Sequence, residues 1–239
     1  MKKFLGVTAL VLLVATIASA SVLFTPLPMG KGKWGASVSG TQTSNWQDQK
    51  DAKGNGYSAS VAYGVLDKLD LYVQVGQIKS DKLTSPTGVP AAPLGTLDMT
   101  TNQYGFLLKY NILNDAEGAP VSVAVGAGAA TLGTSITFTL PALLGGTAFT
   151  GTSNGSYGGG GVMVSKLFIP FVPYVGVQYL MAGGDFAKYT QLDITGGTYI
   201  AFSRNWGCFV EYSAQTQTPD GGGPSVNLNQ IAASISWGQ

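Results

Sequence analysis

The sequence predicts an all-β protein, a closed antiparallel up-and-down transmembrane β-barrel preceded by a cleaved signal peptide. Three observations predict this fold. Apolar and small polar residues alternate with a period of two from residue 33 almost to the C-terminus. Charged residues make up only 10% of the chain, against roughly 25% in a typical soluble domain. After residue 20 no stretch approaches the ~20 apolar residues of a membrane-spanning helix, so strands must carry the hydrophobicity.

The N-terminus has the three parts of a secretory signal in their usual order. Lys2 and Lys3 are followed by an apolar run over residues 5–17 and then by Ala18-Ser19-Ala20, which forms a small-residue cleavage site. We therefore assign residues 1–20 to a signal peptide, 21–30 to a short periplasmic segment and 31–239 to the barrel. A retained single-span anchor is the alternative, and the shortness of the apolar run disfavours it. Cys208 is the only cysteine, so the chain can form no internal disulfide.

The alternation marks ten strands, and an even number suits a closed antiparallel barrel. We place them, in chain order, near residues 33–40, 57–65, 69–76, 103–110, 121–128, 158–168, 175–179, 190–202, 208–213 and 230–237. For the stretches 158–168 and 190–202 the pattern leaves open which face is which. Counts of eight or twelve strands remain as alternatives.

The connections between these strands alternate in length. Short turns are expected near 67–68, 112–118, 169–173 and 203–205, and longer links at 43–55, 79–100, 131–155, 182–188 and 215–225. Short turns at one end and long loops at the other are typical of outer-membrane barrels, in which both termini lie in the periplasm.

The residue types on the two faces predict which one contacts lipid. A solvated exterior should carry Lys, Glu and Thr, whereas the more polar face here is mostly Ser, Gly, Ala and Gln, small groups that suit a narrow lumen. The other face is rich in Val, Leu, Tyr and Phe, as in Leu71, Val73 and Val75. We expect this apolar face to look outward into the membrane.

Aromatic residues near the strand ends predict two girdles at the membrane interfaces. Tyr57 and Tyr63 are six residues apart, as are Tyr104 and Tyr110, which is roughly 20 Å along a strand at ~3.3 Å per residue. At a tilt of about 40° this height falls within an apolar band of ~25 Å. The predicted girdle residues are Trp34, Tyr57, Tyr63, Tyr104, Tyr110, Tyr179, Trp206, Tyr212 and Trp237.

A second set of polar and charged residues is expected to point into the lumen. This set is Asp70, Tyr72, Gln74, Gln103, Lys109, Gln178 and Glu211. One interpretation is a charged constriction that filters ions. We favour the other, a buried network of ion pairs and Gln and Tyr side chains, because the interior of a ten-stranded barrel is small enough for side chains to fill it.

The sequence offers no catalytic, metal, cofactor or nucleic-acid site. The chain contains no His, and Asp70 and Glu211 lie on separate strands with no motif around them. Metal binding is disfavoured because the lone Cys208 faces lipid in this pattern. The net charge of +1 and the single arginine, Arg204, argue against a nucleic-acid partner.

The segment 131–155 is unusual for an external loop because it contains several apolar residues, among them Ile136, Phe138, Leu140 and Phe149. Three interpretations stay open. The flanking strands could extend beyond the membrane as a hairpin that turns at 141–146 and packs on its neighbours, which we favour. The segment could instead fold over the barrel mouth, or it could bind a surface partner or lipid.

The chain resembles the small outer-membrane β-barrel superfamily, the surface-antigen and opacity-type barrels. The resemblance rests on YGVLDKLDLYVQVG (63–76), GFLLKYNIL (105–113), VSKLFIPFVPYVGVQY (164–179) and IAASISW (231–237). It implies a location in the bacterial outer membrane, contact with outer-membrane lipid, and insertion by the barrel-assembly machinery through the last strand. Such barrels usually end on an aromatic residue, whereas here Trp237 is followed by Gly238 and Gln239. Outer-membrane enzymes of this kind use an essential His, which this chain lacks.

Together these observations predict a non-enzymatic outer-membrane barrel with a largely side-chain-filled lumen and a structural or surface-interaction role. One alternative is a narrow, weakly selective pore for ions or small solutes. Another is a soluble exported barrel that binds a hydrophobic ligand.

Overall fold

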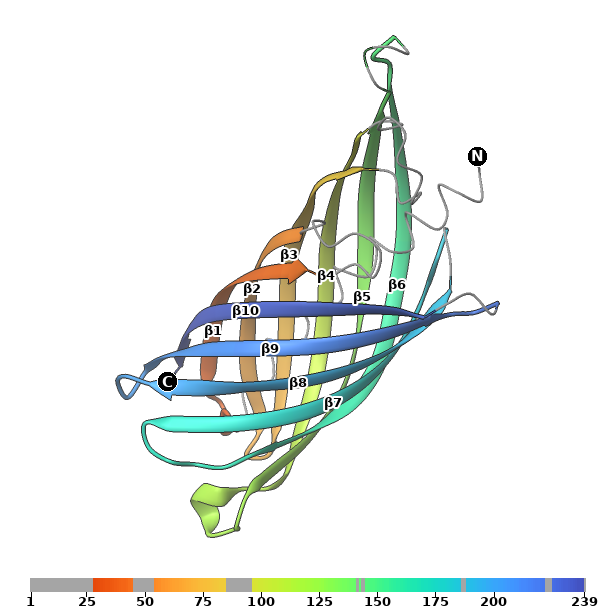
Figure 1. Ribbon diagram of the computed structural model, residues 1–239. Coiled ribbons are helices and arrows are strands. Elements are labelled where there is room, and N and C mark those ends of the chain that lie inside the picture. Colours follow the sequence, from red (N-terminus) through yellow and green to blue (C-terminus); the bar gives the residue numbers. More distant parts are fainter. Residues whose placement is uncertain are drawn as a thin grey trace.

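The computed structural model is a closed antiparallel barrel of ten strands (Figure 1). It describes residues 28–44, 54–84, 96–140, 142, 145–185, 188–221 and 225–238, the side chains of 81–84, 96–97 and 226 aside. The predicted signal peptide and most of the segment 21–30 lie outside these residues. The strands are β1 (Trp34–Ser44), β2 (Gly54–Leu66), β3 (Leu69–Thr84), β4 (Thr96–Leu113), β5 (Ser122–Thr139), β6 (Ala148–Ser165), β7 (Phe171–Gly184), β8 (Tyr189–Ala201), β9 (Trp206–Pro219) and β10 (Val226–Gly238).

Each strand pairs with its neighbours in the sequence, and β10 closes the sheet against β1. The closing pair sets Ala36 opposite Trp237 and Thr43 opposite Gln230. Closure leaves no strand edge exposed, which a sheet surrounded by lipid requires because unpaired backbone groups in hydrocarbon cost several kcal/mol each. The predicted fold class and the count of ten strands are confirmed.

The apolar face of the sheet points outward, as the sequence predicts. On β3, Val73 and Val75 are about half exposed, whereas Tyr72 and Gln74 between and beside them are buried in the interior. The same alternation runs along β7 and β9. A soluble barrel with a hydrophobic ligand would need the reverse arrangement, with its apolar face inward.

The outward face changes from apolar to polar toward the long-loop end. On every strand but β7 the outward residues turn polar at this end, at Gln42, Asn55, Gln77, Asn102, Thr131, Ser156, Thr190, Thr216 and Asn229. Hydrogen bonds run along this level from the Tyr57 hydroxyl to Gln77 and from the Gln77 amide to Asn102. On β4 the apolar stretch from Tyr104 to Ile112 is roughly 26 Å long at ~3.3 Å per residue, or about 20 Å high at a ~40° tilt.

The strands extend further at the long-loop end than the hydropathy pattern predicts. The expected loop 79–100 shortens to 85–95, because β3 continues to Thr84 and β4 begins at Thr96. The other long links shorten likewise, to 45–53, 140–147, 185–188 and 220–225. The predicted ends are wrong because outward residues beyond the lipid are polar, so the hydrophobic alternation fades while cross-strand pairing continues.

The segment 131–155 is mostly strand, and the hairpin of the favoured interpretation is confirmed, whereas its extension beyond the membrane stays a prediction. β5 and β6 stay in register to Thr139 opposite Ala148, with the turn at 140–147. Figure 1 shows this hairpin rising beyond the other strands. Near its tip, Phe138 lies opposite Phe149, whose side chain is more than half exposed.

On β3, β4 and β5 the inner face becomes more apolar where the outer face turns polar. Met99 lies opposite Ile136, and both are buried with Ile78 on the neighbouring strand. Beyond the lipid the strands therefore bury apolar side chains, as a water-soluble sheet does. This reversal marks the level at which the surroundings of the barrel change from hydrocarbon to water.

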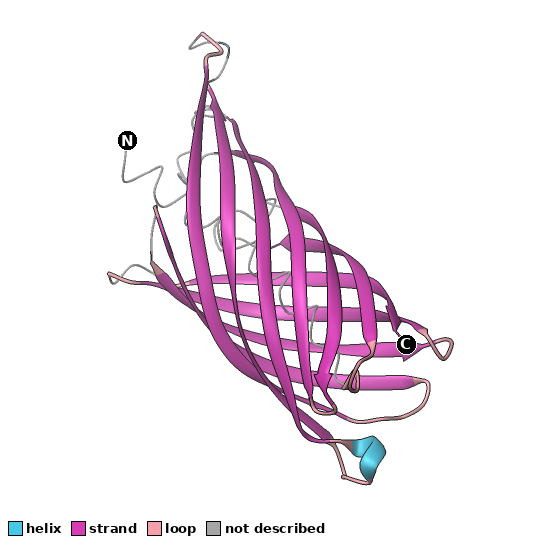
Figure 2. Ribbon diagram, turned by 180° about the vertical axis from the view of Figure 1, so that it is seen from behind, coloured by secondary structure: helices cyan, strands magenta, loops and turns pink. Residues whose placement is uncertain are grey.

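The short-turn end carries a 3-10 turn, Asp115–Glu117, seen in cyan in Figure 2. The Asp115 carboxylate accepts hydrogen bonds from Lys166 Nζ at 2.9 Å and from the Leu167 N–H at 2.8 Å. These hydrogen bonds, Lys166 first, hold the pKa of Asp115 below its usual value. The contacts tie the β4–β5 turn to the β6–β7 turn. Within the described ranges, no helix is long and apolar enough to span a membrane.

Glycines form much of the wall over β5 and β6, and several of them have no room for a side chain, Gly128 and Gly159 least of all. A Cβ on Gly128 would overlap the Phe106 carbonyl oxygen, and one on Gly159 would overlap the Tyr179 carbonyl oxygen. Both positions face inward, where a strongly curved sheet brings the neighbouring backbone close. The glycine run 158–161 thus permits a sharp bend in the barrel wall.

Candidate functional site in the barrel lumen

A layer of packed side chains crosses the lumen in its short-turn half. Met163, Tyr174 and Phe209 form a buried cluster contributed by β6, β7 and β9, with Leu107 and Tyr199 against it. Leu107 also packs against a second cluster, Ala62 and Tyr72 from β2 and β3, together with Met29. Leu107 therefore links the two clusters, and we call the whole set the lumen layer.

The most buried charged side chains among the described residues lie beside this layer. Lys109 Nζ is 3.0 Å from an Asp70 carboxylate oxygen, and both side chains have 0% exposure. The two residues are directly opposite on β3 and β4, so the strand register itself brings them together. Lys109 Nζ also lies 5.4 Å from the centre of the Tyr72 ring. A buried pair needs such close geometry because desolvation otherwise outweighs the attraction between the charges.

The chain just before β1 reaches the same carboxylate. The Met29 N–H donates to both Asp70 oxygens, at 3.2 and 3.3 Å. Its side chain completes the second cluster of the lumen layer. The backbone at Gly30 lies very close to Gly64. A Cβ on Gly64 would overlap the Gly30 carbonyl group. Hydrogen bonds between Gly64 and its neighbours Gly32 and Lys33 hold this approach in place.

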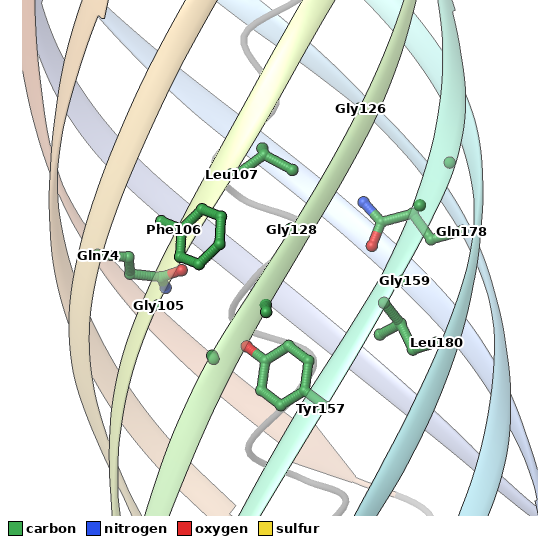
Figure 3. Close-up of a pocket in the computed structure, with 14 residues that line it drawn as sticks. Gln74, Gly105, Phe106, Leu107, Gly126, Gly128, Tyr157, Gly159, Gln178 and Leu180 are labelled. Atoms are coloured by element: carbon green, nitrogen blue, oxygen red, sulfur yellow. The ribbon is translucent and has the colours of Figure 1, made fainter.

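The other predicted lumen residues make further contacts. Gln103 donates to the Tyr157 hydroxyl, and the Tyr174 hydroxyl donates to Glu211 at 2.8 Å. Gln74 and Gln178 line a cavity of about 40 Å³ beside the glycine wall (Figure 3). All seven predicted lumen residues are buried, but Asp70, Tyr72 and Lys109 are the group that the described contacts join directly.

The nine predicted girdle residues lie on the outward face. Seven of them are about half exposed or more, whereas Tyr63 and Trp237 are partly covered. Trp34 packs on Tyr63 with ring centres 4.5 Å apart, and Trp206 lies opposite Trp237 across β9 and β10. Tyr57, Tyr104, Tyr179 and Tyr212 stand next to the level at which the outer face turns polar.

Sequence reasoning missed several lumen residues. Met29 was assigned to a periplasmic segment, and no local pattern indicates that it enters the barrel. Met163 and Asp193 fall in the two stretches whose faces were left open. For Asp193 a signal did exist, because Leu192 and Ile194 on either side mark it as inward-facing.

The lumen contains polar groups but no arrangement that indicates catalysis. Within the described residues, no group of three or more His, Cys, Asp or Glu lies together as a metal site would require. Cys208 is partly exposed on the outward side of β9.

Comparisons with known proteins show the fold. No protein-family model matches the chain. No curated protein matches it either. Among solved structures it is similar to the translocator domain of the autotransporter NalP from Neisseria meningitidis, with 13% identity and a TM-score of 0.52, covering 97% of this chain and 96% of that one. It is also similar to the β-domain of the Bordetella autotransporter BrkA, with 12% identity and a TM-score of 0.52, covering 86% and 98%.

At such identities the likeness concerns the fold. The closed ten-stranded sheet has its apolar face outside and its polar face inside, and its outer face turns polar at one end. Together with these likenesses in fold, the arrangement is that of a closed antiparallel β-barrel whose apolar face is turned outward, as in a transmembrane barrel.

Proposed function

We propose that the protein is a non-enzymatic, non-conducting outer-membrane barrel with a structural or surface-interaction role. The observation that carries this proposal is the lumen layer, which reaches from β2 to β9 across the short-turn half of the barrel. An open pore would leave the charges beside this layer in contact with water, whereas Asp70 and Lys109 are fully buried.

The outer face supports a stable position in the membrane. We propose that the nine girdle residues anchor the barrel at the two lipid interfaces, where aromatic rings with polar groups are favoured. We also propose that β10 is the strand through which the barrel-assembly machinery recognises the chain. Its pairing with β1 is the last contact that closure requires.

The surface part of the role is assigned to the β5–β6 hairpin. It extends furthest from the lipid, and Phe149 exposes more than half of its side chain near the tip. An aromatic side chain held on a paired strand is a suitable contact for another surface molecule, because little flexibility is lost on binding.

Planar-bilayer recording tests the closed lumen. The purified mature barrel should give no steady single-channel steps. A variant whose mature chain begins at Lys31 loses Met29, and with it a hydrogen-bond donor to Asp70 and part of the lumen layer. It should show flickering conductance. Met181→Ala, on the exposed outer face, is the matched control and should stay silent.

Steady steps from the mature barrel itself would contradict the proposal and favour the narrow-pore alternative. Should the shortened variant fail to insert, Met29→Gly provides the second test, because it removes only the packed side chain.

A further inference from the structure

The sheet extends past the rest of the barrel at the long-loop end, and this extension has a free edge on β6. Pairing between β6 and β7 ends at Gly155, opposite Gly184. Pairing between β5 and β6 continues further, to Thr139 opposite Ala148. Figure 1 shows β5 and β6 rising past the end of β7. Over residues 148–153, no described strand pairs with β6 on the side away from β5.

Backbone groups along this edge point away from the sheet. Asn154 marks the side, because its N–H donates to the Asp185 carboxylate at 2.9 Å and its carbonyl oxygen accepts from the Asp185 N–H at 3.1 Å. Successive residues of a strand direct these groups to alternate sides, so those of Thr150 and Thr152 point the same way as those of Asn154. A row of such groups is a template for another extended backbone.

The sequence of the β6 edge does nothing to oppose pairing. Residues 148–154 read AFTGTSN, with no charged residue and no proline. The extension has a second edge, on β3 beyond Ser80, where the register with β4 shifts and the sequence is Asp81-Lys82. Irregular pairing and charged residues protect a free edge from other strands. The β6 edge is therefore the one suited to bind another strand.

The side chains of the β6 edge fit a second copy of the same edge. When Thr150 lies opposite its counterpart in an antiparallel pair, Phe149 of each copy lies opposite Gly151 of the other. Phe149 is 56% exposed, and a Cβ on Gly151 would meet no atom within 4 Å, so the space over this glycine is free for a ring. An aromatic ring over a glycine and a threonine opposite a threonine both stabilise neighbouring strands.

We propose that the β6 edge pairs antiparallel with the β6 edge of a second copy of this chain, held in a facing membrane. This pairing rests on the surface-interaction role proposed for the β5–β6 hairpin and names its partner. A two-fold axis relates identical edges in an antiparallel pair, so the contact is complete with two copies. Antiparallel strands also point the two barrels in opposite directions, which places the copies in opposed membranes with their long-loop ends together.

Contact between vesicles tests this pairing. The mature barrel is reconstituted into two batches of phosphatidylcholine vesicles, whose lipids carry a donor or an acceptor dye. Wild-type vesicles should dock and give energy transfer. Thr150→Pro should abolish the transfer, because it removes an N–H from the free edge and leaves the pairing with β5 intact. Thr150→Val, which keeps this N–H, is the matched control and should give transfer.

A charge exchange at the same position tests whether the partner is a second copy. Thr150→Lys places like charges opposite each other in the pair, as does Thr150→Glu, so vesicles that carry either variant alone should not dock. Mixing the two kinds of vesicle should restore the transfer. These variants also replace Thr150→Pro if that variant fails to fold, which loss of heat-modifiable migration on gels would show.

Transfer that persists in Thr150→Pro would overturn the proposal, as would an absence of transfer between wild-type vesicles. Equal transfer from wild-type vesicles to protein-free vesicles would also overturn it, because Phe149 would then be contacting lipid. If the mixed Lys and Glu vesicles stayed apart, pairing centred on Thr150 would be wrong. Bilayer recording measures the lumen and not this edge, so self-pairing and the closed lumen can fail separately.

Discussion

At the scale of single residues, the glycine wall makes a sharp prediction. Gly159→Ala should destabilise the barrel by about 1–3 kcal/mol, as overpacking commonly does, because the new methyl group would overlap the Tyr179 carbonyl oxygen. Gly158→Ala is the matched control. Its methyl group would lie 3.5 Å from the nearest atom, the Gly128 carbonyl oxygen, and should leave stability unchanged or slightly higher. Urea unfolding in detergent micelles measures both, and equal stabilities of the two variants would contradict the prediction.

Residue-level prediction from the sequence succeeds where a strand alternates clearly. Asp70 and Lys109 were assigned to the lumen because each stands between outward apolar residues. Their pairing needed the register of β3 against β4, which short-range pattern does not encode. The position of Met29 in the lumen could not be predicted for another reason. Its contacts with Ala62 and Tyr72 exist only once the barrel has closed around it.

At the scale of elements, the contact between the β4–β5 and β6–β7 turns depends on pH. Hydrogen bonds from Lys166 and the Leu167 N–H lower the pKa of Asp115 in the folded state. The stabilisation is therefore fully present above the unfolded pKa of Asp, about 4, and is lost as the pH falls through the lower folded value. The wild-type barrel should lose stability over this acid range more steeply than Asp115→Asn.

The pH dependence of the thermal midpoint in detergent checks this expectation. Asp220→Asn, at the opposite end of the barrel, should retain the wild-type slope. If Asp115→Asn gave the same slope as the wild type, the turn-to-turn contact would have no energetic role.

The ten strands were predicted from hydropathy, but their ends were not. The pattern used for prediction has apolar residues outward and polar ones inward, so it ends where the outward residues become polar. Beyond Asn102 and Thr131, toward the long-loop end, β4 and β5 continue with polar outward residues. Backbone pairing holds them together there, and this pairing cannot be predicted from the amino-acid composition.

At the scale of the whole molecule, the hairpin should be separable from the barrel. Replacing residues 138–149 with a two-residue Asn-Gly turn removes the exposed tip but keeps Ile136 opposite Met99. The shortened protein should stay folded in detergent, run as a heat-modifiable band on gels and remain silent in bilayers. A large fall in its unfolding temperature would show instead that the tip supports the barrel.

Met29, which completes the lumen layer at the short-turn end, is covalently linked to β1 of the barrel wall. Four residues separate Met29 from Trp34, where β1 begins, so Met29 cannot diffuse away when its contacts with the lumen layer open. A short tether of this kind keeps the effective concentration of the attached group in the millimolar range. Even weak individual contacts would therefore re-form quickly after each thermal opening. The mouth would leak only in brief, self-terminating events.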